Sequence, residues 1–266
     1  MKRSAMLVVT LVAAWLLAGC GTDLQNIASD MDTVEGSGNV IRESREVSGF
    51  TEVALTGIGN LTIRQTGSES LTIEAEDNII PKLTTEVANG RLTLGVEPDT
   101  DLRPTEPINY ELTVKDLNAL HTLGAGDISA ANVEAANLEI ASSGAGEIDA
   151  SSINTNNLEI ANSGSGEISV ANVEANNLKV TSGGSGEVRT AGRVDSQAVD
   201  ISGSGRYQAE DLESQEATVD VKGAGEATVN VTDKLDVRIT GSGSVEYVGD
   251  PTISQEVRGA GELRRR

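Results

Sequence analysis

The sequence contains very few of the residue types that most binding and catalytic sites use. Its 266 residues include one cysteine, one histidine and five aromatic residues. A single cysteine excludes an intramolecular disulfide and a cysteine-based metal cluster. The scarcity of aromatics argues against a surface that stacks bases or sugars. With 41 acidic and 20 basic side chains, the chain also lacks the positive surface that phosphate binding requires, which argues against a nucleic-acid partner.

Residues 1–19 predict a bacterial lipoprotein signal peptide. Two basic residues precede an apolar run over 5–18, which is short for a membrane span and typical of a secretory signal. The run ends in Leu-Ala-Gly-Cys, which resembles a lipobox. The resemblance implies cleavage before Cys20 and a membrane anchor of diacylglycerol on its sulfur. Gly21 stands where an aspartate would imply retention in the inner membrane, so we expect attachment to the outer membrane. The alternative is an ordinary signal peptide followed by a chance cysteine.

The dominant feature of the remaining chain is a repeat. A glycine–small residue–glycine triplet recurs eight times, at intervals of 18 to 20 residues. The triplets begin at Gly124, Gly144, Gly164, Gly184, Gly203, Gly223, Gly241 and Gly259. Such a period is typical of a solenoid, in which each unit buries its apolar side only by stacking on the next unit.

The residues between the triplets favour strands. Leu138 and Ile140 flank Glu139, and the same apolar–polar–apolar pattern returns in the next coils. This alternation is typical of a half-buried strand, and so short a unit has no room for two helices. We therefore expect three short strands per coil, joined by corners at which glycine supplies a positive φ. The predicted fold is all-β, a right-handed parallel β-helix with about 20 residues per coil. An antiparallel sandwich or a propeller is the alternative.

The chain before and after the repeats has a different texture. Residues 20–45 are polar and show no apolar periodicity, so we expect a flexible tether. Residues 46–117 contain less regular strands and a tight-turn signal at Asn89, which predicts N-terminal β coils and a cap. The regular repeats would occupy 118–262, and 263–266 would form a basic tail that deters edge pairing.

Three stretches of the cap occur in a recognisable order. They are Val-Ser-Gly-Phe-Thr-Glu-Val at 47–53, Gly-Ile-Gly-Asn-Leu-Thr-Ile at 57–63 and Asn-Gly-Arg-Leu-Thr-Leu at 89–94. Together with the glycine corners from 124 onward, they resemble the bacterial head GIN domain, a family described as "putative autotransporter adhesin" and as a domain of unknown function. The resemblance covers about residues 45–262 and implies a β-helical envelope protein, often lipid-anchored, without catalytic residues. The second stretch departs from a strict Gly-Ile-Asn.

An acidic residue follows each of the first four triplets directly. These residues are Asp127, Glu147, Glu167 and Glu187. Stacking would place their carboxylates in a column about 5 Å apart, where like charges repel one another. The column is either a solvated stripe that keeps the rod soluble or a site for Ca²⁺, which favours several carboxylate oxygens. No other cofactor is indicated.

Two further features concern polar side chains. Asn137, Asn157 and Asn177, with Gln197 in the next coil, predict a column of amides that bond from coil to coil, with ligand recognition as the alternative. His121 has no nucleophile or carboxylate beside it in the sequence, so we expect a structural histidine.

These features favour a lipid-anchored, non-enzymatic protein of the cell envelope. Its acidic rod would serve adhesion or scaffolding through many weak contacts, with an envelope protein or a surface glycan as partner. A calcium-stabilised structural module, and a stress or signalling accessory that binds another envelope protein, are the alternatives. A polysaccharide-degrading β-helix enzyme is more distant, because the basic residues are scattered rather than gathered in a groove.

Overall fold

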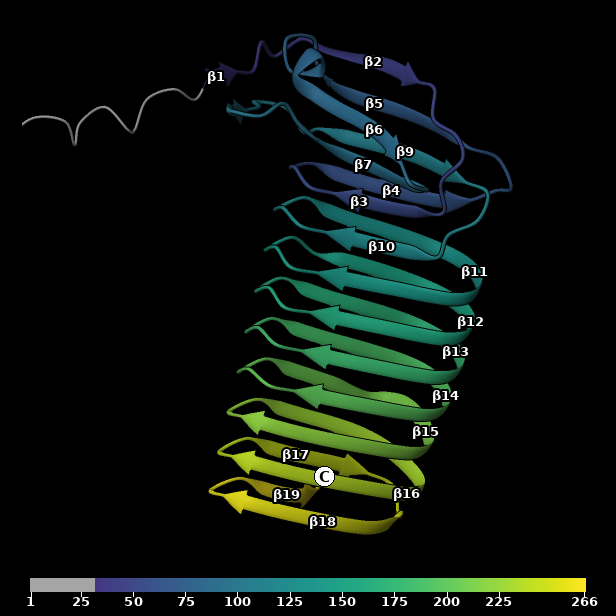
Figure 1. Cartoon of the computed structure of the whole chain (residues 1–266), viewed down its shortest axis with the longest axis vertical. Helices are drawn as coiled ribbons and strands as arrows, with labels where there is room; N and C mark the ends of the chain where they lie inside the picture. Colours follow the sequence, from purple (N-terminus) through teal and green to yellow (C-terminus); the bar gives the residue numbers. More distant parts are fainter. Residues whose placement is uncertain (1–31) are drawn as a thin grey trace, which may run out of the picture.

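The computed structural model describes residues 32–266, which form a rod of stacked coils (Figure 1). The expected signal peptide 1–19, the lipidation site Cys20 and the first part of the tether lie outside the described residues. Within 32–266, no helix is long and apolar enough to cross a membrane. The described chain is almost entirely strand, with one short 3-10 helix, η1 (Ile80–Lys82), inside the cap.

Six long strands make the regular coils, and each pairs in parallel with the next. They are β11 (Asp127–Ser142), β12 (Ile148–Asn162), β13 (Glu167–Ser182), β14 (Glu187–Ile201), β15 (Arg206–Gly223) and β16 (Glu226–Gly241). Ile128 lies opposite Ile148, which in turn lies opposite Ile168. Equivalent residues of successive repeats therefore stack on one another, and the predicted all-β parallel solenoid is confirmed.

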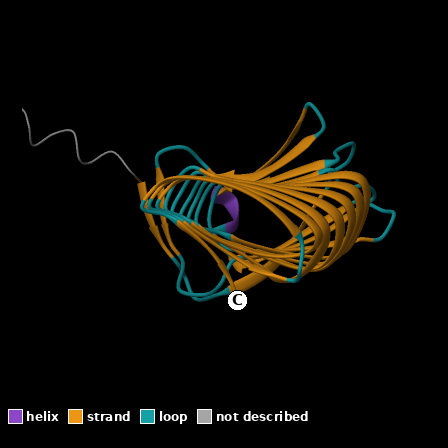
Figure 2. Cartoon of the chain, turned by 90° about the horizontal axis from the view of Figure 1, so that it is seen from below, coloured by secondary structure: helices purple, strands orange, loops and turns teal. Residues whose placement is uncertain are grey.

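Each coil is one bent strand rather than three separate strands. Pairing between β11 and β12 is interrupted only at Asn132 and Ala136. At the first interruption the chain rounds the edge of the rod, and Asn132, Ser152 and Asn172 take positive φ values of 55–57° there. The three expected strands are thus three paired stretches of one strand, and the sharp corner lies at the glycine triplet alone (Figure 2).

Side chains that face inward alternate along each strand and fill the core. In β11 the five inward aliphatic residues are at most 2% exposed: Ile128, Ala130, Val133, Leu138 and Ile140. Stacking turns each position into an aliphatic column that runs through the rod. Full burial of one such large side chain contributes about 1.5–3 kcal/mol, so the columns hold the coils in register.

The triplets that begin at Gly144 and Gly164 need glycine because successive corners stack too closely for a side chain. We expected a positive φ to be the reason, but φ is not positive at these glycines. A Cβ atom on Gly144 would lie 1.8 Å from the carbonyl oxygen of Gly124, and one on Gly164 would lie 2.0 Å from that of Gly144. Among the triplet glycines, φ is positive only at the later corners, as at Gly223 (131°) and Gly241 (127°). The upper corners therefore approach one another as closely as bare backbone permits.

The cap closes the upper end of the rod by switching from parallel to antiparallel pairing. β2 (Val40–Arg45), β5 (Ser70–Glu76) and β9 (Asn109–Val114) pair antiparallel in that order, and β6 (Leu83–Ala88) pairs antiparallel with β7 (Arg91–Val96). β3 (Glu52–Leu55), β4 (Asn60–Gln65) and β10 (Ala119–Thr122) lead in parallel into the first regular coil. Phe50, Ile79 and Ile80 are at most 2% exposed and fill the top of the core.

Residues 32–45, which we expected to end the flexible tether, are folded into the cap. β1 (Asp32–Glu35) pairs with β8 (Thr100–Arg103), and β2 pairs with β5. The buried Glu76 accepts hydrogen bonds from the Thr105 hydroxyl and amide and from the Gly38 amide, at 2.5, 2.9 and 2.6 Å. These bonds hold the pKa of Glu76 below its usual range, and the bond from the Thr105 hydroxyl has the largest effect. Because β2 is mostly exposed, its sequence carries no apolar period.

The lower end of the rod has no such plug among the described residues. β17 (Ser244–Val248) and β18 (Thr252–Gly259) stack on β16 and form the last full coil. β19 (Glu262–Arg265) stacks on β17 and begins a further level, so most of the expected basic tail 263–266 belongs to a strand. Ile253 and Val257 continue the inward columns of Leu235 and Ile239. They are 38% and 40% exposed, whereas the residues above them are fully buried.

Candidate functional site

The four acidic candidates stand in consecutive coils, as the period predicts. The backbone amide of Glu147 donates to Asp127 at 2.8 Å. Arg189 reaches Glu167 at 2.5 Å and Glu187 at 2.9 Å, so one arginine offsets part of the negative charge in the lower half of the column. Across residues 32–266, no three carboxylate, imidazole or thiol side chains gather to hold a metal ion. Cation binding by this column stays a prediction.

The amide column is present and continuous over three coils. The Asn157 amide donates to Asn137 at 2.7 Å, and the Asn177 amide donates to Asn157 at 2.9 Å. The next member is Ser196, whose hydroxyl donates to Asn177 at 2.9 Å. The prediction that Gln197 is the fourth member of the column was wrong. Gln197 pairs with Leu178, points into the core and is 2% exposed.

A missing residue explains the misplacement of Gln197. Val170 pairs with Thr190, but Val173 already pairs with Gly192, so β14 is one residue shorter at the bend. Side chains alternate between the two faces of a strand. Because β14 lacks one residue, a count of 20 from Asn177 reaches the inward-facing Gln197, and the outward position belongs to Ser196.

His121 is half-buried and does not form a catalytic pair in the described residues. Its Nε2 is buried without a hydrogen-bond partner. Burial lowers its pKa, against the opposing charge of Glu139. A general base needs an orienting partner and a proton donor within reach, and neither contacts this nitrogen.

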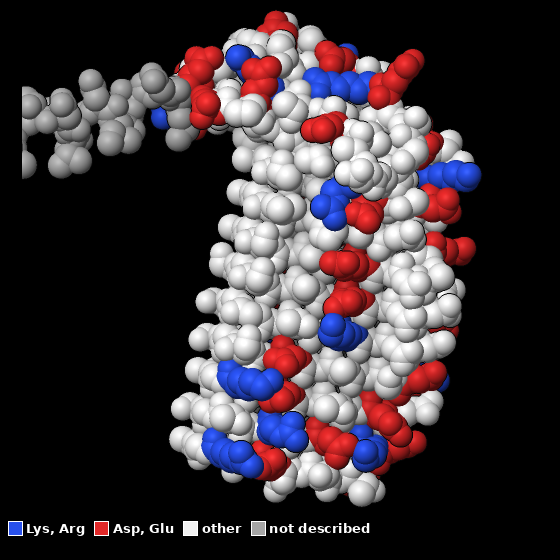
Figure 3. Space-filling model, in the orientation of Figure 1, with Lys and Arg blue, Asp and Glu red and all other residues white. Residues whose placement is uncertain are grey.

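The outward surface differs between two parts of the rod. We call residues 118–186 the middle coils and 187–266 the lower coils. The middle coils contain eight acidic residues and one basic residue, Lys179, which pairs with Glu159 at 2.6 Å. Acidic and basic side chains alternate densely over the lower coils, where Figure 3 shows them side by side.

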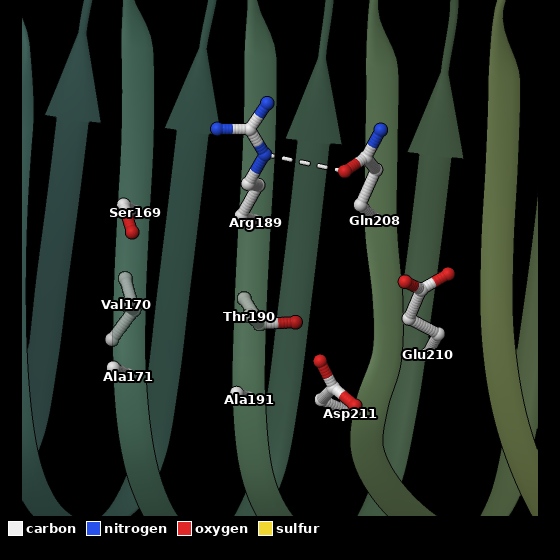
Figure 4. Close-up of a pocket in the computed structure, with 9 residues that line it drawn as sticks. All are labelled: Ser169, Val170, Ala171, Arg189, Thr190, Ala191, Gln208, Glu210 and Asp211. Atoms are coloured by element: carbon white, nitrogen blue, oxygen red, sulfur yellow. Dashed lines mark hydrogen bonds between the residues drawn. The ribbon is translucent and has the colours of Figure 1, made fainter.

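A groove that the sequence did not predict lies beside β15. Arg189 pairs with Gln208, whereas Gly192 pairs with Leu212, so β15 bulges by one residue. The bulge pushes Glu210 and Asp211 outward. Small side chains leave a hollow of about 200 Å³ beside them; its nine lining residues are Ser169, Val170, Ala171, Arg189, Thr190, Ala191, Gln208, Glu210 and Asp211 (Figure 4).

One signal in the sequence could have located this groove. Glu210 and Asp211 stand together, and two adjacent charges break the alternation of inward and outward residues. Such a break is typical of a β-bulge.

The comparison with protein families gives one match that covers most of the chain. The family described as "Putative auto-transporter adhesin, head GIN domain" matches residues 49–171 and again 150–251. The two overlapping matches fit the repetitive body. No curated protein matches the chain.

Solved structures share the whole fold. A "putative lipid binding protein" from Parabacteroides distasonis superposes with a TM-score of 0.83 and 28% identity, over 88% of this chain and 100% of that one. A "putative adhesin" from Bacteroides fragilis has a TM-score of 0.69 and 25% identity, over 88% and 100%. Another from Parabacteroides merdae, at 20% identity and a TM-score of 0.81 over 88% and 99%, shares the fold alone.

Proposed function

This chain belongs to the head GIN domain family, and on that premise we propose that it is an adhesin-like protein of the bacterial cell envelope. It would attach without catalysis, through the repeated outward surface of its middle coils. The observation that carries this proposal is the register of the coils, because Asn137, Asn157 and Asn177 present the same amide at successive levels. Each level adds a similar weak contact, and linked weak contacts give high avidity.

Two observations support a role without catalysis. The one histidine of the chain has no partner on its buried nitrogen within residues 32–266. The basic residues of the lower coils are engaged in ion pairs, such as Arg206 with Glu226 at 2.9 Å and Lys222 with Asp200 at 3.0 Å. Incubation with a panel of envelope and algal polysaccharides tests this part, because any catalysed cleavage would contradict it.

The membrane attachment that we propose rests on Cys20. A lipid on this residue would hold the rod at the outer membrane, since two or more acyl chains anchor a protein stably. The test is the full-length Cys20→Ala variant, for which we expect loss of lipid labelling and release from the membrane fraction. Labelling of the variant to the wild-type level would remove Cys20 as the anchor.

The adhesive surface can be tested by changing its composition and not its fold. We expect cells that carry the triple variant Asn137→Ala, Asn157→Ala and Asn177→Ala to attach less to a panel of immobilised glycans and envelope proteins. A matched control replaces Ser129 and Ser151 by alanine, since these residues lie on the other side of the same coils and outside the groove beside β15. Equal attachment of wild type and triple variant would contradict the proposal.

A scaffold role inside the envelope is the second candidate. The adhesin-like neighbour from B. fragilis favours adhesion. Cross-linking in intact cells separates the two, because a scaffold would capture another envelope protein while attachment to external surfaces stayed unchanged.

A further inference from the structure

The groove beside β15 lies where the regular repeat of the middle coils is broken. It forms where the bulge at Glu210 and Asp211 follows the shortened strand β14. Ala171, Ala191 and Asp211 lie at one end of it, and Arg189 and Gln208 lie at the other end, joined by a hydrogen bond of 3.2 Å (Figure 4). A ligand here would bind once per chain.

The charges around the groove leave one carboxylate without a partner. Arg189 is matched by Glu167 and Glu187. Glu210 pairs with Arg266, which reaches up from the last coil. Among residues 32–266, no basic side chain lies within 4.0 Å of the Asp211 carboxylate. The groove therefore holds an uncompensated negative charge.

The chemistry of the groove selects one class of ligand. Sugar rings stack on exposed aromatic side chains, but the nearest aromatic residue along the strand, Tyr207, is fully buried. A divalent cation needs several oxygen ligands, and no group of three acidic, histidine or cysteine side chains gathers within 32–266. A hollow of about 200 Å³ is smaller than the pockets that hold drug-sized molecules. It has room for the end of one side chain.

We propose that this groove receives a lysine or arginine side chain of a basic protein partner. The cation would pair with Asp211 at the bulge, its aliphatic stem would lie over Ala171 and Ala191, and the Gln208 amide and the Ser169 hydroxyl would contact the partner's backbone. The site lies apart from the amide column, so it stands or falls independently of the proposed adhesive surface.

The experiment measures binding of a fluorescent hexalysine peptide to the full chain in detergent at low salt, with fully acetylated hexalysine as the reference probe. We expect one peptide per chain. Asp211→Asn should weaken binding about fivefold, the ratio that corresponds to about 1 kcal/mol. Glu139→Gln is the matched control. Glu139 is exposed, lies on the opposite face of the rod, and makes no ion pair with any residue of 32–266. It should stay within about twofold of the wild type.

A second variant separates the shape of the groove from its charge. Ala191→Leu fills the end of the hollow beside Asp211 at constant net charge and should abolish peptide binding. Should leucine impair folding, Ala191→Gln serves the same purpose on a smaller scale. Unchanged melting of each variant confirms that the fold is intact.

Three results would overturn the proposal. Equal weakening by Asp211→Asn and Glu139→Gln would mean attraction to overall charge, and unchanged binding by both position-191 variants would mean that the hollow is not used. Binding of an amino-sugar oligomer as tight as that of hexalysine would assign the groove to a glycan instead. The triple asparagine variant should bind hexalysine normally, so failure here and failure of the adhesive surface are distinguishable.

Discussion

The middle and lower coils stack in the same way, but different outward side chains connect one coil to the next. In the middle coils, identical neutral residues stack, and the interval between triplets is 20 residues each time. In the lower coils the intervals vary, and neighbouring coils are joined by opposite charges, as Lys222 of β15 pairs with Asp200 of β14 at 3.0 Å. The difference teaches that a solenoid needs a shared core, and that its surface contacts can be repetitive or particular to each level.

The middle and lower coils also differ in where their buried polar side chains lie. In the middle coils, each strand ends in a buried polar residue just before the glycine triplet: Ser142, Asn162 and Ser182. The Asn162 amide donates to the carbonyl of Gly166 at 2.8 Å. The same position holds Ile201 in β14 and aliphatic residues in the coils that follow. The lower core instead contains a polar network around the fully buried Tyr207. Each region thus places its buried polar groups at a different point of the coil.

The largest expected effect is at the corners. Gly164→Ala places a Cβ 2.0 Å from the carbonyl oxygen of Gly144 and close to further backbone atoms. Gly205→Ala meets one side-chain atom, the Ser182 hydroxyl, at 2.4 Å and lies farther from the backbone, 2.8 Å from the carbonyl oxygen of Gly186. We expect the first change to lower the free energy of unfolding by about 3 kcal/mol or more, and the second by roughly half as much. Thermal unfolding followed by circular dichroism measures both. Equal losses would show that the two kinds of corner are equally rigid.

The polar network of the lower coils comes next. The Tyr207 hydroxyl contacts Thr190 at 3.0 Å and Gln197 at 3.1 Å. Tyr207→Phe leaves these buried groups short of a partner and should lower stability by about 1–3 kcal/mol. Tyr247→Phe is the control, because no hydrogen bond of its hydroxyl is seen in residues 32–266.

A double variant sharpens this test. Gln197→Leu restores the leucine of the middle coils at that position, so adding it to Tyr207→Phe should recover part of the loss, since removing both partners of a hydrogen bond costs less than removing one. No recovery would mean that the network contributes through packing alone.

Salt should act with opposite sign on the two regions. Raising the NaCl concentration screens the ion pairs of the lower coils, each of which contributes less than about 1 kcal/mol at the surface. The same screening relieves repulsion among the unpaired carboxylates of the middle coils. Hydrogen exchange read by mass spectrometry should therefore show lower protection in β15 and β16 and higher protection in β11 and β12. A change of one sign throughout would remove the distinction.

The smallest effect is expected from calcium. Arg189 already occupies Glu167 and Glu187, which leaves only Asp127 and Glu147 of the acidic column for a cation. We expect the melting midpoint to stay the same with and without millimolar calcium. A clear rise that Glu147→Gln removed would establish a cation site in the middle coils and overturn this expectation.

The sequence predicts the fold well because its glycines repeat at a nearly constant interval. The same regularity hides its exceptions. Gln197 was misplaced because counting from the preceding corner cannot locate a missing residue in the bend. The sequence marks the bulge by the adjacent charges of Glu210 and Asp211, but the hollow beside it depends on the pairing of β15 with β14, which one strand alone does not contain. The role of the upper corner glycines depends on the distance to the next coil, which no single repeat contains.

The direction of the hydrogen bonds between coils has a mechanical consequence. The two ends of the described chain lie at opposite ends of the rod (Figure 1), and the bonds between coils, such as that from the Ser143 amide to the Thr122 carbonyl at 3.0 Å, run along its length. Tension between the ends would load these bonds one level at a time and peel coils singly. Each released coil adds about 70 Å of extended chain, so the rod would lengthen in steps under load before it broke.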